Sequence, residues 1–335
     1  MKLLIITQAV DSEDPILGFF VRWIEEFAKH AERIEVICLK EGKHSLPANV
    51  RVHSLGKEKG VSRIKYILNF YTYIWRLRRD YDTVFVHMNP EYVVLGGLFW
   101  RIWKKRIAFW YLHKNVDLKL RIAVFFANII LTASKESFRL HTKKLNIVGH
   151  GIPTNLFICP MQEMSGTLRI LTAGRISKTK NISLLLDAAD ILTARGVPFM
   201  LVIAGAPVTA ADIKYAERVY ARAGSTVQFV GPKTQSEIAA LLCEANVFVN
   251  LGENGSMDKA VLEALCAGIP VVTGNEAYKH LLEPLGLFVA FDASAIADAL
   301  QRAPRVNISP LATYVREHHS LQRLIPAILR AIQAL

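Results

Sequence analysis

The chain has 335 residues, of which 52% are hydrophobic and 21% are charged, and its formal net charge is +12. This balance excludes a disordered protein and is enough for two domains with separate cores. No stretch of about 20 residues is free of charge, so we expect no membrane-spanning helix. The start, MKLLIITQ, turns polar too soon for a signal peptide, so we expect none.

Strand and helix signals alternate along the first half of the chain, which is typical of a parallel sheet covered on both faces. The expected strands span 2–7, 33–39, 49–55, 83–88, 106–113, 129–133 and 146–148. The expected helices span 15–31, 62–79, 91–104 and 135–142. His113, at the end of the fifth expected strand, is a candidate for a ligand site, because ligands of such sheets bind beyond the carboxyl ends of strands.

Basic residues and aromatic residues are mixed between positions 59 and 144, where 17 Lys and Arg stand against 5 Asp and Glu. Residues 1–155 carry 25 basic and 14 acidic side chains, so nearly all of the excess charge lies in the first half. Aromatic and basic residues on one amphipathic surface favour an anionic membrane interface. We favour that partner over nucleic acid. A solvated basic face above ordinary core aromatics is the alternative.

The loop 150–167 contains two prolines and has no clear period, so we place a domain boundary there. The expected domains are 1–155 and 156–308, and a closing segment, 309–335, is expected to return to the first domain. Strands of the second domain are expected at 168–173, 199–204, 227–230, 247–250, 269–273 and 287–290. The four cysteines have no CxxC spacing. We expect Cys38, Cys243 and Cys266 to be reduced core residues, which favours a cytoplasmic protein.

The segment VFVNLGENGSMDKAVLEALCAGIPVV, 247–272, predicts a buried strand, a glycine-rich turn, a helix from about Ser256 to Gly268 and a second strand. The start of a helix presents unpaired N–H groups and partial positive charge, so this turn suits a phosphate. Glu263 is expected to share a helix face with Ser256 and Lys259. Its carboxylate could accept hydrogen bonds from sugar hydroxyls.

This segment resembles the nucleotide-binding part of the retaining GT-B glycosyltransferases, in the family named glycosyl transferases group 1 (family four). Leu262-Glu263-Ala264, Ala267-Gly268 and 270–272 match its LEA-x-A-x-G-x-PVV run. LRILTAGR, 168–175, followed by Lys180, matches its Gly-Arg-x-x-x-x-Lys motif, although Asn181 stands where a glycine is usual. LVIAGAP, 201–207, and VQFVGPK, 227–233, follow in order. The family's first glutamate is missing, and its place is taken by Gly255.

The resemblance covers about 167–275 and implies two Rossmann-like, doubly wound domains that face each other across a cleft. It implies that Arg175 and Lys180 clamp the diphosphate, that Glu263 holds the ribose and that His113 faces the transferred sugar. The other donor-binding residues that it implies are Gly18, Gly174, Lys233, Gly255, Ser256, Met257 and Asp258.

The expected activity is hexosyl transfer, with retention, from a nucleotide-diphospho sugar to a lipid-linked acceptor or a surface polysaccharide. We expect a cytoplasmic enzyme that is peripheral on the inner face of the membrane. We expect no metal, because the sequence has no DxD pair after a strand, no HExxH and no Cys/His cluster. A degenerate protein that binds sugar nucleotide or a partner without catalysis is the main alternative. An epimerase, an exported sugar receptor and a nicotinamide enzyme, which would need G-x-G-x-x-G, are less favoured.

Overall fold

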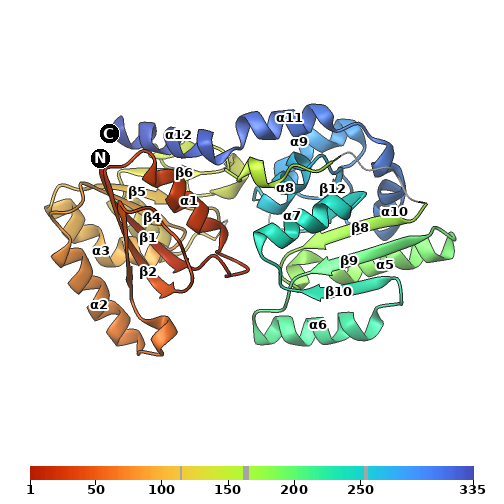
Figure 1. Cartoon of the computed structure of the whole chain (residues 1–335), viewed down its shortest axis with the longest axis horizontal. Helices are drawn as coiled ribbons and strands as arrows, with labels where there is room; N and C mark the ends of the chain where they lie inside the picture. The colour runs from red at the N-terminus through yellow and green to blue at the C-terminus, as the bar shows by residue number, and fades with distance from the viewer. Residues whose placement is uncertain (114, 161–165, 253–255) are drawn as a thin grey trace. The chain divides into compact units, whose positions relative to one another are not determined.

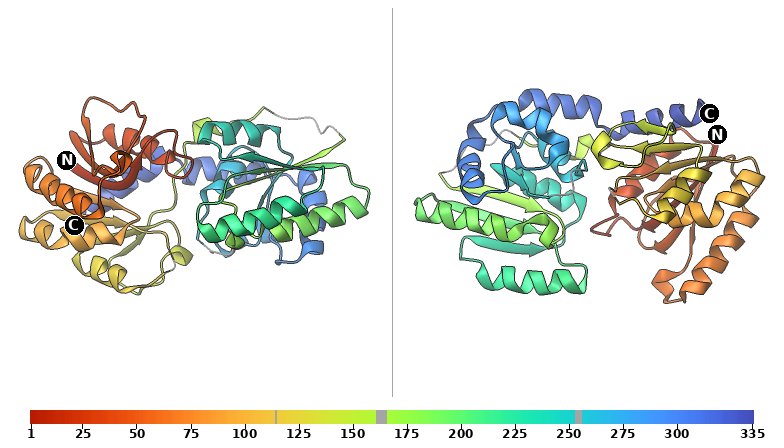
Figure 2. Two further views of the ribbon diagram at one scale, coloured as in Figure 1. Left: turned by 90° about the horizontal axis from the view of Figure 1, so that it is seen from below. Right: turned by 180° about the vertical axis from the view of Figure 1, so that it is seen from behind.

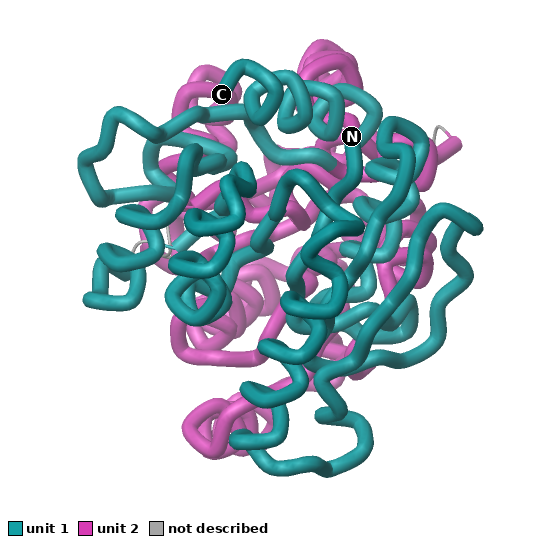
Figure 3. The backbone as a smooth tube through the Cα atoms, turned by 90° about the vertical axis from the view of Figure 1, so that its left-hand side faces the viewer, with its two compact units in different colours: residues 1–151, 321–335 teal, residues 152–320 magenta. Residues whose placement is uncertain are grey.

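The computed structural model describes residues 1–113, 115–160, 166–252 and 256–335. The chain divides into two compact units, which Figure 3 shows in different colours. Unit 1 comprises residues 1–151 and 321–335, and unit 2 comprises residues 152–320. The last fifteen residues therefore belong to the same unit as the first half of the chain.

Unit 1 is built on a seven-stranded parallel sheet with the order β3-β2-β1-β4-β5-β6-β7. Its strands are β1 (Lys2–Val10), β2 (Arg33–Glu41), β3 (Val50–Ser54), β4 (Thr83–His87), β5 (Arg106–Trp110), β6 (Ile129–Thr132) and β7 (Leu145–Ile147). The central strands are almost continuously apolar, and every residue of β4 and β6 is buried. Such strands need helices on both faces of the sheet.

Five helices surround this sheet (Figures 1 and 2). They are α1 (Phe19–Ala28), α2 (Arg63–Arg76), α3 (Pro90–Ile102), α4 (Leu118–Phe126) and α12 (Leu321–Gln333). Helix α12 is strongly amphipathic and packs on α1 and β6 through a buried stripe that includes Ile325, Ile328 and Ile332. Its apolar residues recur at three- and four-residue intervals, which places them on one face.

Unit 2 repeats the scheme with a five-stranded parallel sheet of order β10-β9-β8-β11-β12. Its strands are β8 (Leu168–Ala173), β9 (Phe199–Ala204), β10 (Val227–Gly231), β11 (Val247–Asn250) and β12 (Val271–Thr273). Its helices are α5 (Ile182–Ala194), α6 (Ala210–Arg222), α7 (Gln235–Glu244), α8 (Lys259–Cys266), α9 (Lys279–Leu282), α10 (Ala293–Arg302) and α11 (Ser309–His318). Two doubly wound sheets of the expected class are thus confirmed.

Three expected elements differ in the structure. Residues 135–142 contain only the 3-10 turn Lys135–Ser137, after which the chain is extended at Phe138. Residues 287–290 form a single bridge, Thr273 to Phe288, rather than a strand. The closing segment is two helices, because the chain leaves the helix at His319 to pair with Ile152, whose N–H donates to the His319 carbonyl at 2.8 Å.

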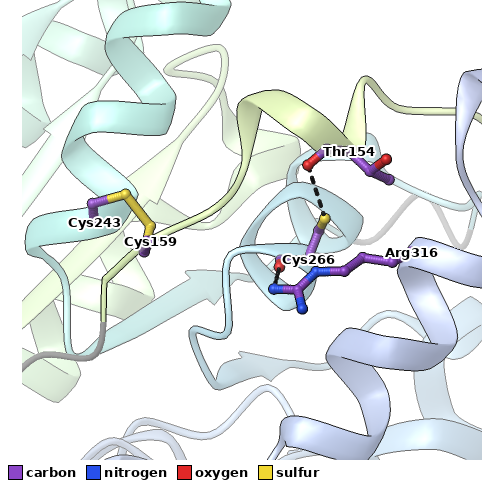
Figure 4. Close-up of a disulfide and its surroundings, with 5 residues drawn as sticks. All are labelled: Thr154, Cys159, Cys243, Cys266 and Arg316. Atoms are coloured by element: carbon purple, nitrogen blue, oxygen red, sulfur yellow. Dashed lines mark hydrogen bonds between the residues drawn. A yellow bond between two sulfur atoms is a disulfide. The ribbon is translucent and has the colours of Figure 1, made fainter.

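The expectation that Cys243 is a reduced core residue was wrong. Cys243, near the end of α7, forms a disulfide with Cys159, 84 positions earlier in the sequence (Figure 4). The positions of the cysteines in the sequence could not reveal this pair, because the two residues become neighbours only when the loop before β8 packs against α7. Cys38 and Cys266 are free and buried, as expected. The disulfide removes the argument for a cytoplasmic location that rested on cysteine usage.

Across the part of the chain that the structure describes, every helix is too short or too polar to cross a bilayer.

Replacing Ile328 of α12 by alanine should lower the free energy of unfolding of unit 1 by about 2–5 kcal/mol, because its fully buried side chain would leave a cavity. All five tryptophans lie in residues 1–151, so their fluorescence during urea unfolding reports on this unit. Arg330→Ala, at an exposed position of the same helix, is the matched control. Equal stability of the two variants would show that α12 does not support unit 1.

Candidate functional site

The predicted phosphate-binding residues meet at one edge of the unit 2 sheet. Strands β8 and β11 are parallel neighbours, with Ile170 paired to Val247. Their carboxyl ends therefore lie together, and the turns that follow them are adjacent. Gly174, Arg175, Lys180 and Asn250 line one small cavity there. A β-carbon built at Gly174 would lie 3.8 Å from Lys180 Nζ, and one built at Gly252 would lie 3.5 Å from it.

Gly205 gives the first of these turns its shape. Its φ is +149°, and a β-carbon there would lie 1.8 Å from the carbonyl oxygen of Gly174, whose own φ is +139°. The two glycines follow the neighbouring strands β9 and β8, and only the absence of a side chain allows this approach. The sequence located Gly205 within the LVIAGAP motif but gave it no role. Its role is to hold the turn that carries Arg175.

Arg175 extends from this turn with 44% of its side chain exposed. Its Nε lies 3.8 Å from Asp212 Oδ2, and Asp212 completes the capping box at the start of α6. The separation is long and the guanidinium itself is exposed, so this ion pair contributes little stability. The guanidinium can therefore exchange this partner for a phosphate at small cost.

Lys180 closes the 3-10 turn Lys178–Lys180, and its ammonium is bound to a carboxylate. Nζ donates to Asp258 Oδ2 at 2.5 Å, and Asn250 Nδ2 donates to the same oxygen at 3.0 Å. Burial alone would raise the pKa of Asp258, but the charge of Lys180 and the hydrogen bonds from Lys180 and Asn250 lower it to about 2. Asp258 is thus ionised, and Lys180 carries one fixed hydrogen bond.

Asn181 explains how the chain departs from the usual glycine after this lysine. Its φ is +50° and its ψ is 39°, which is the left-handed region. Asparagine is one of the few residues other than glycine that adopts this conformation readily. Its Nδ2 also donates to the carbonyl of Leu251 at 3.1 Å. The substitution therefore preserves the turn and ties it to the end of β11.

Helix α8 begins at Lys259, three residues later than predicted, with Asp258 as its N-cap. Oδ1 of Asp258 accepts a hydrogen bond from the Ala260 N–H at 3.2 Å. Glu263 lies one turn beyond Lys259 and is 7% exposed. Gln235 Nε2, at the start of α7, donates to Glu263 Oε1 at 2.7 Å. The predicted proximity of Lys259 and Glu263 is thus confirmed, and the predicted helix start at Ser256 was wrong.

Burial dominates the ionisation of this pair. It raises the pKa of Glu263, although Lys259 and Gln235 act in the opposite direction. It lowers the pKa of Lys259 to about 8, despite the nearby charges of Glu263 and Asp258. A buried carboxylate with one oxygen hydrogen-bonded to an amide is suited to accept further hydrogen bonds from hydroxyl groups.

The remaining predicted residues of unit 2 have different surroundings. The Ser256 carbonyl accepts a hydrogen bond from Asn275 Nδ2 at 2.9 Å, and Met257 packs against the core. Lys233 Nζ lies 3.3 Å from Glu237 Oε1, at the start of α7. Gly255 lies outside the residues that the structure describes.

Two predicted residues belong to unit 1. Gly18 is the N-cap of α1, and a β-carbon there would lie 2.6 Å from the Asp14 carbonyl oxygen. The packing of its own loop therefore accounts for a glycine at this position. His113 is exposed and lies three residues beyond the end of β5, which is shorter than the expected strand 106–113.

Asn250 and Gln235 are site residues that the sequence analysis missed. Asn250 ends the otherwise apolar strand β11 and is 2% exposed, and its carbonyl accepts a hydrogen bond from Thr273 Oγ1 at 2.6 Å. A polar residue at the carboxyl end of a buried strand was the available signal. Gln235 follows an ordinary N-cap, Thr234, and the sequence around it contains no comparable signal.

Replacing Gly205 by alanine should displace the turn at Gly174 and weaken nucleoside diphosphate binding. Gly196→Ala is the control, because its φ is +68° but nothing lies within 4 Å of an added β-carbon. Strain alone should cost about 1–2 kcal/mol of stability in both variants, and the clash should add about 1–3 kcal/mol at Gly205. Thermal unfolding and calorimetric titration with nucleoside diphosphates measure both effects. If the two variants bind equally well, Gly205 does not shape the site.

Comparison with known proteins agrees with this geometry. Residues 167–304 match the profile of the family described as glycosyl transferases group 1. Over 142 residues, the chain is 29% identical to an amylovoran biosynthesis glycosyltransferase, AmsK, of Erwinia amylovora. That alignment covers 40% of this chain and 35% of the relative, so the chain spans about a third of that protein.

Solved structures match over the whole chain. Anabaena HepE, in complex with UDP and glucose, matches with a TM-score of 0.77 and 15% identity, and the match covers 100% of both chains. Sucrose-phosphate synthase from Thermosynechococcus elongatus matches with a TM-score of 0.77 and 16% identity, covering 99% and 98% of the two chains. At this level of identity the likeness shows the fold. The chain therefore has the GT-B fold, and residues 167–304 of its C-terminal unit resemble the glycosyl transferases group 1 family.

Proposed function

We propose that this protein transfers a hexosyl group, with retention, from a nucleotide-diphospho sugar to a glycan or a lipid-linked acceptor. The observation that carries the proposal is the position of Lys180 Nζ between the glycine turns after β8 and β11. Arg175 borders the same cavity and has an exposed, weakly held guanidinium. Two cations beside glycine turns suit a diphosphate, since the backbone can approach it closely.

Glu263 supports a sugar nucleotide as the donor. Its buried carboxylate can accept hydrogen bonds from the ribose hydroxyls. The neighbouring Gln235 adds to this, because its Oε1 is buried without a hydrogen-bond partner among the described residues. The structure of Anabaena HepE was solved with UDP-glucose, and that likeness supports a donor of the same class. The proposal does not depend on the identity of the base.

The chemistry that we propose needs little from the protein beyond positioning and charge. The bond from the anomeric carbon to the β-phosphate oxygen breaks, and a bond from that carbon to the acceptor oxygen forms on the same face. The acceptor proton passes to the departing phosphate. Arg175 and Lys180 would stabilise the charge that develops on that phosphate. In this proposal the two cations perform the role of a divalent metal, so none is required.

A non-catalytic protein is the second candidate, and the sequence at Gly255 favours it. The family's first glutamate is absent there, so a contact to the transferred sugar would be lost. Such a protein would still bind the nucleotide through the residues of unit 2. Measured sugar transfer, or hydrolysis of the donor, separates the two candidates.

We also propose that unit 1 docks on an anionic membrane, where a lipid-linked acceptor would be found. Exposed apolar side chains lie along α2 and at the end of α3: Ile64, Ile67, Leu68, Trp75, Leu98 and Ile102. A groove of about 520 Å³ lies between them, lined by Tyr71, Trp75, Phe99 and Trp103. An exposed apolar surface of this kind marks an interaction site.

The charge around this groove supports an anionic membrane as the partner. The guanidinium of Arg78 lies 4.5 Å above the ring of Trp75, and Arg76 lines the groove itself. Arg101 and Lys104 extend the basic surroundings along α3 and the turn after it. Tryptophan rings with basic neighbours suit the headgroup region of anionic lipid, where rings enter the interface and cations meet phosphate.

Replacing Arg175 by alanine should lower kcat about 10²- to 10³-fold, because a stabilising charge worth about 2–4 kcal/mol in the transition state is lost. Donor turnover with UDP-, GDP-, ADP- and dTDP-sugars measures the change. Arg169→Ala is the control, since this exposed arginine of β8 is paired with Glu244. Activity of Arg175→Ala within tenfold of the wild type would contradict the assignment.

Replacing both Trp75 and Trp103 by alanine should weaken binding to anionic vesicles about tenfold or more, because two interfacial rings are lost. Co-sedimentation with phosphatidylcholine vesicles, with and without phosphatidylglycerol, at low and high salt, tests this. Tyr220→Ala, at an exposed aromatic of unit 2, is the control. The docking proposal fails if wild type does not bind anionic vesicles at low salt.

A further inference from the structure

We propose that Asp258 is a positioning residue for Lys180: its carboxylate holds the ammonium at the diphosphate site before the donor arrives. The proposal rests on the proposed function, and it assigns Asp258 a role through Lys180 rather than a contact with the donor. The central observation is the hydrogen bond of 2.5 Å from Lys180 Nζ to Asp258 Oδ2.

Lysine needs such a partner to act as a preorganised cation. Its ammonium sits on a flexible four-carbon chain and has three N–H donors. Among the described residues, one of these donors is directed to Asp258, and a phosphate could engage the others. The ammonium also lies beside the glycine turns at Gly174 and Gly252, where a phosphate can reach it. Preorganised charge acts without rearrangement as the leaving group departs.

Asp258 is itself held firmly. Its Oδ2 accepts from Asn250 Nδ2 at 3.0 Å, and its Oδ1 accepts from the Ala260 N–H at 3.2 Å. Its carbonyl accepts a hydrogen bond of 2.6 Å from the hydroxyl of Tyr278, a side chain with no exposed surface. These contacts come from the end of β11, the start of α8 and the turn after β12. Asp258 is therefore held in one position, and its hydrogen bond restrains the flexible side chain of Lys180.

A direct role in donor binding does not fit the charge of this residue. Asp258 stays ionised, and a carboxylate that faced the diphosphate would repel it. A plain capping role does not fit either, because asparagine and serine cap helices as well as aspartate does. What aspartate adds over asparagine is the negative charge that Lys180 contacts. Asp258→Asn therefore separates positioning from capping.

The test is a double-mutant cycle with Asp258→Asn, Lys180→Met and the double variant. Turnover of UDP-, GDP-, ADP- and dTDP-glucose is followed by release of the nucleoside diphosphate, and its affinity is measured by calorimetry. Asp258→Asn should lower kcat about 10- to 100-fold, as loss of an orienting partner does elsewhere. The dissociation constant of the diphosphate should change less than about threefold. In the Lys180→Met background, Asp258→Asn should have no further effect on kcat.

Asp292→Asn is the matched control, because Asp292 caps α10 in the same way and accepts from the Ala295 N–H at 2.8 Å. It should leave kcat unchanged. Asp258→Ser, which keeps a capping oxygen without the charge, should reproduce the loss if the asparagine variant does not fold. Asp258→Glu, which keeps the charge, should recover part of the activity.

Two results would overturn the inference while leaving the proposed function in place. One is a kcat for Asp258→Asn within threefold of wild type. The other is an equal loss in the Lys180→Met background, which would mean that the two residues act independently. If the wild type neither turns over nor binds any of the four nucleotides, the proposed function itself fails.

Discussion

The constraint on which the site depends is the parallel pairing of β8 with β11. It brings together two turns that contain Gly174 and Gly252, which are 78 positions apart in the sequence, and each glycine leaves room for the ammonium of Lys180. Gly205, on the far side of β8, must also lack a side chain, because its neighbour's carbonyl occupies that space. A side chain at Gly205 would displace the turn at Gly174, which leads to Arg175. The cations are therefore positioned by backbone packing more than by their own side-chain contacts.

Each cation of the site has an acidic neighbour in the absence of ligand. Arg175 lies 3.8 Å from Asp212, Lys180 lies 2.5 Å from Asp258, and Lys259 is electrostatically linked to Glu263. The three ion pairs differ in how tightly the acidic residue holds its cation. The Arg175–Asp212 pair is long and its arginine is exposed, whereas the Lys180–Asp258 pair is short and supported by Asn250. A bound diphosphate would therefore replace Asp212 as the partner of Arg175, whereas Lys180 would contact both the diphosphate and Asp258. Arg175 is therefore the more loosely held of the two cations.

Much of the fold of unit 2 and of its site could be predicted from the sequence, and the predictions that were wrong failed for physical reasons. Strands β8, β9 and β11 were placed to the residue, because apolar runs bounded by glycine leave little freedom. The start of α8 was misplaced, because Ser256 and Asp258 are both good N-caps and only the contacts of Asp258 decide between them. The Cys159–Cys243 disulfide and the Gln235–Glu263 hydrogen bond join distant segments, and no local pattern encodes them. The closing segment, 309–335, is divided into two helices where Ser320 forms a backbone bridge with Ile152.

The distribution of charge also separates the tasks of the two halves of the chain. Residues 1–155 carry 25 basic and 14 acidic side chains, while the remaining 16 basic and 15 acidic side chains nearly balance. At physiological ionic strength, charges are screened beyond about 8 Å, so a basic surface acts on what touches it. The excess of basic residues on unit 1 is therefore suited to an anionic surface that touches it. A donor site in the nearly neutral half would need a local source of positive charge, and Lys180, held by the partly buried hydrogen bonds around Asp258, can provide it.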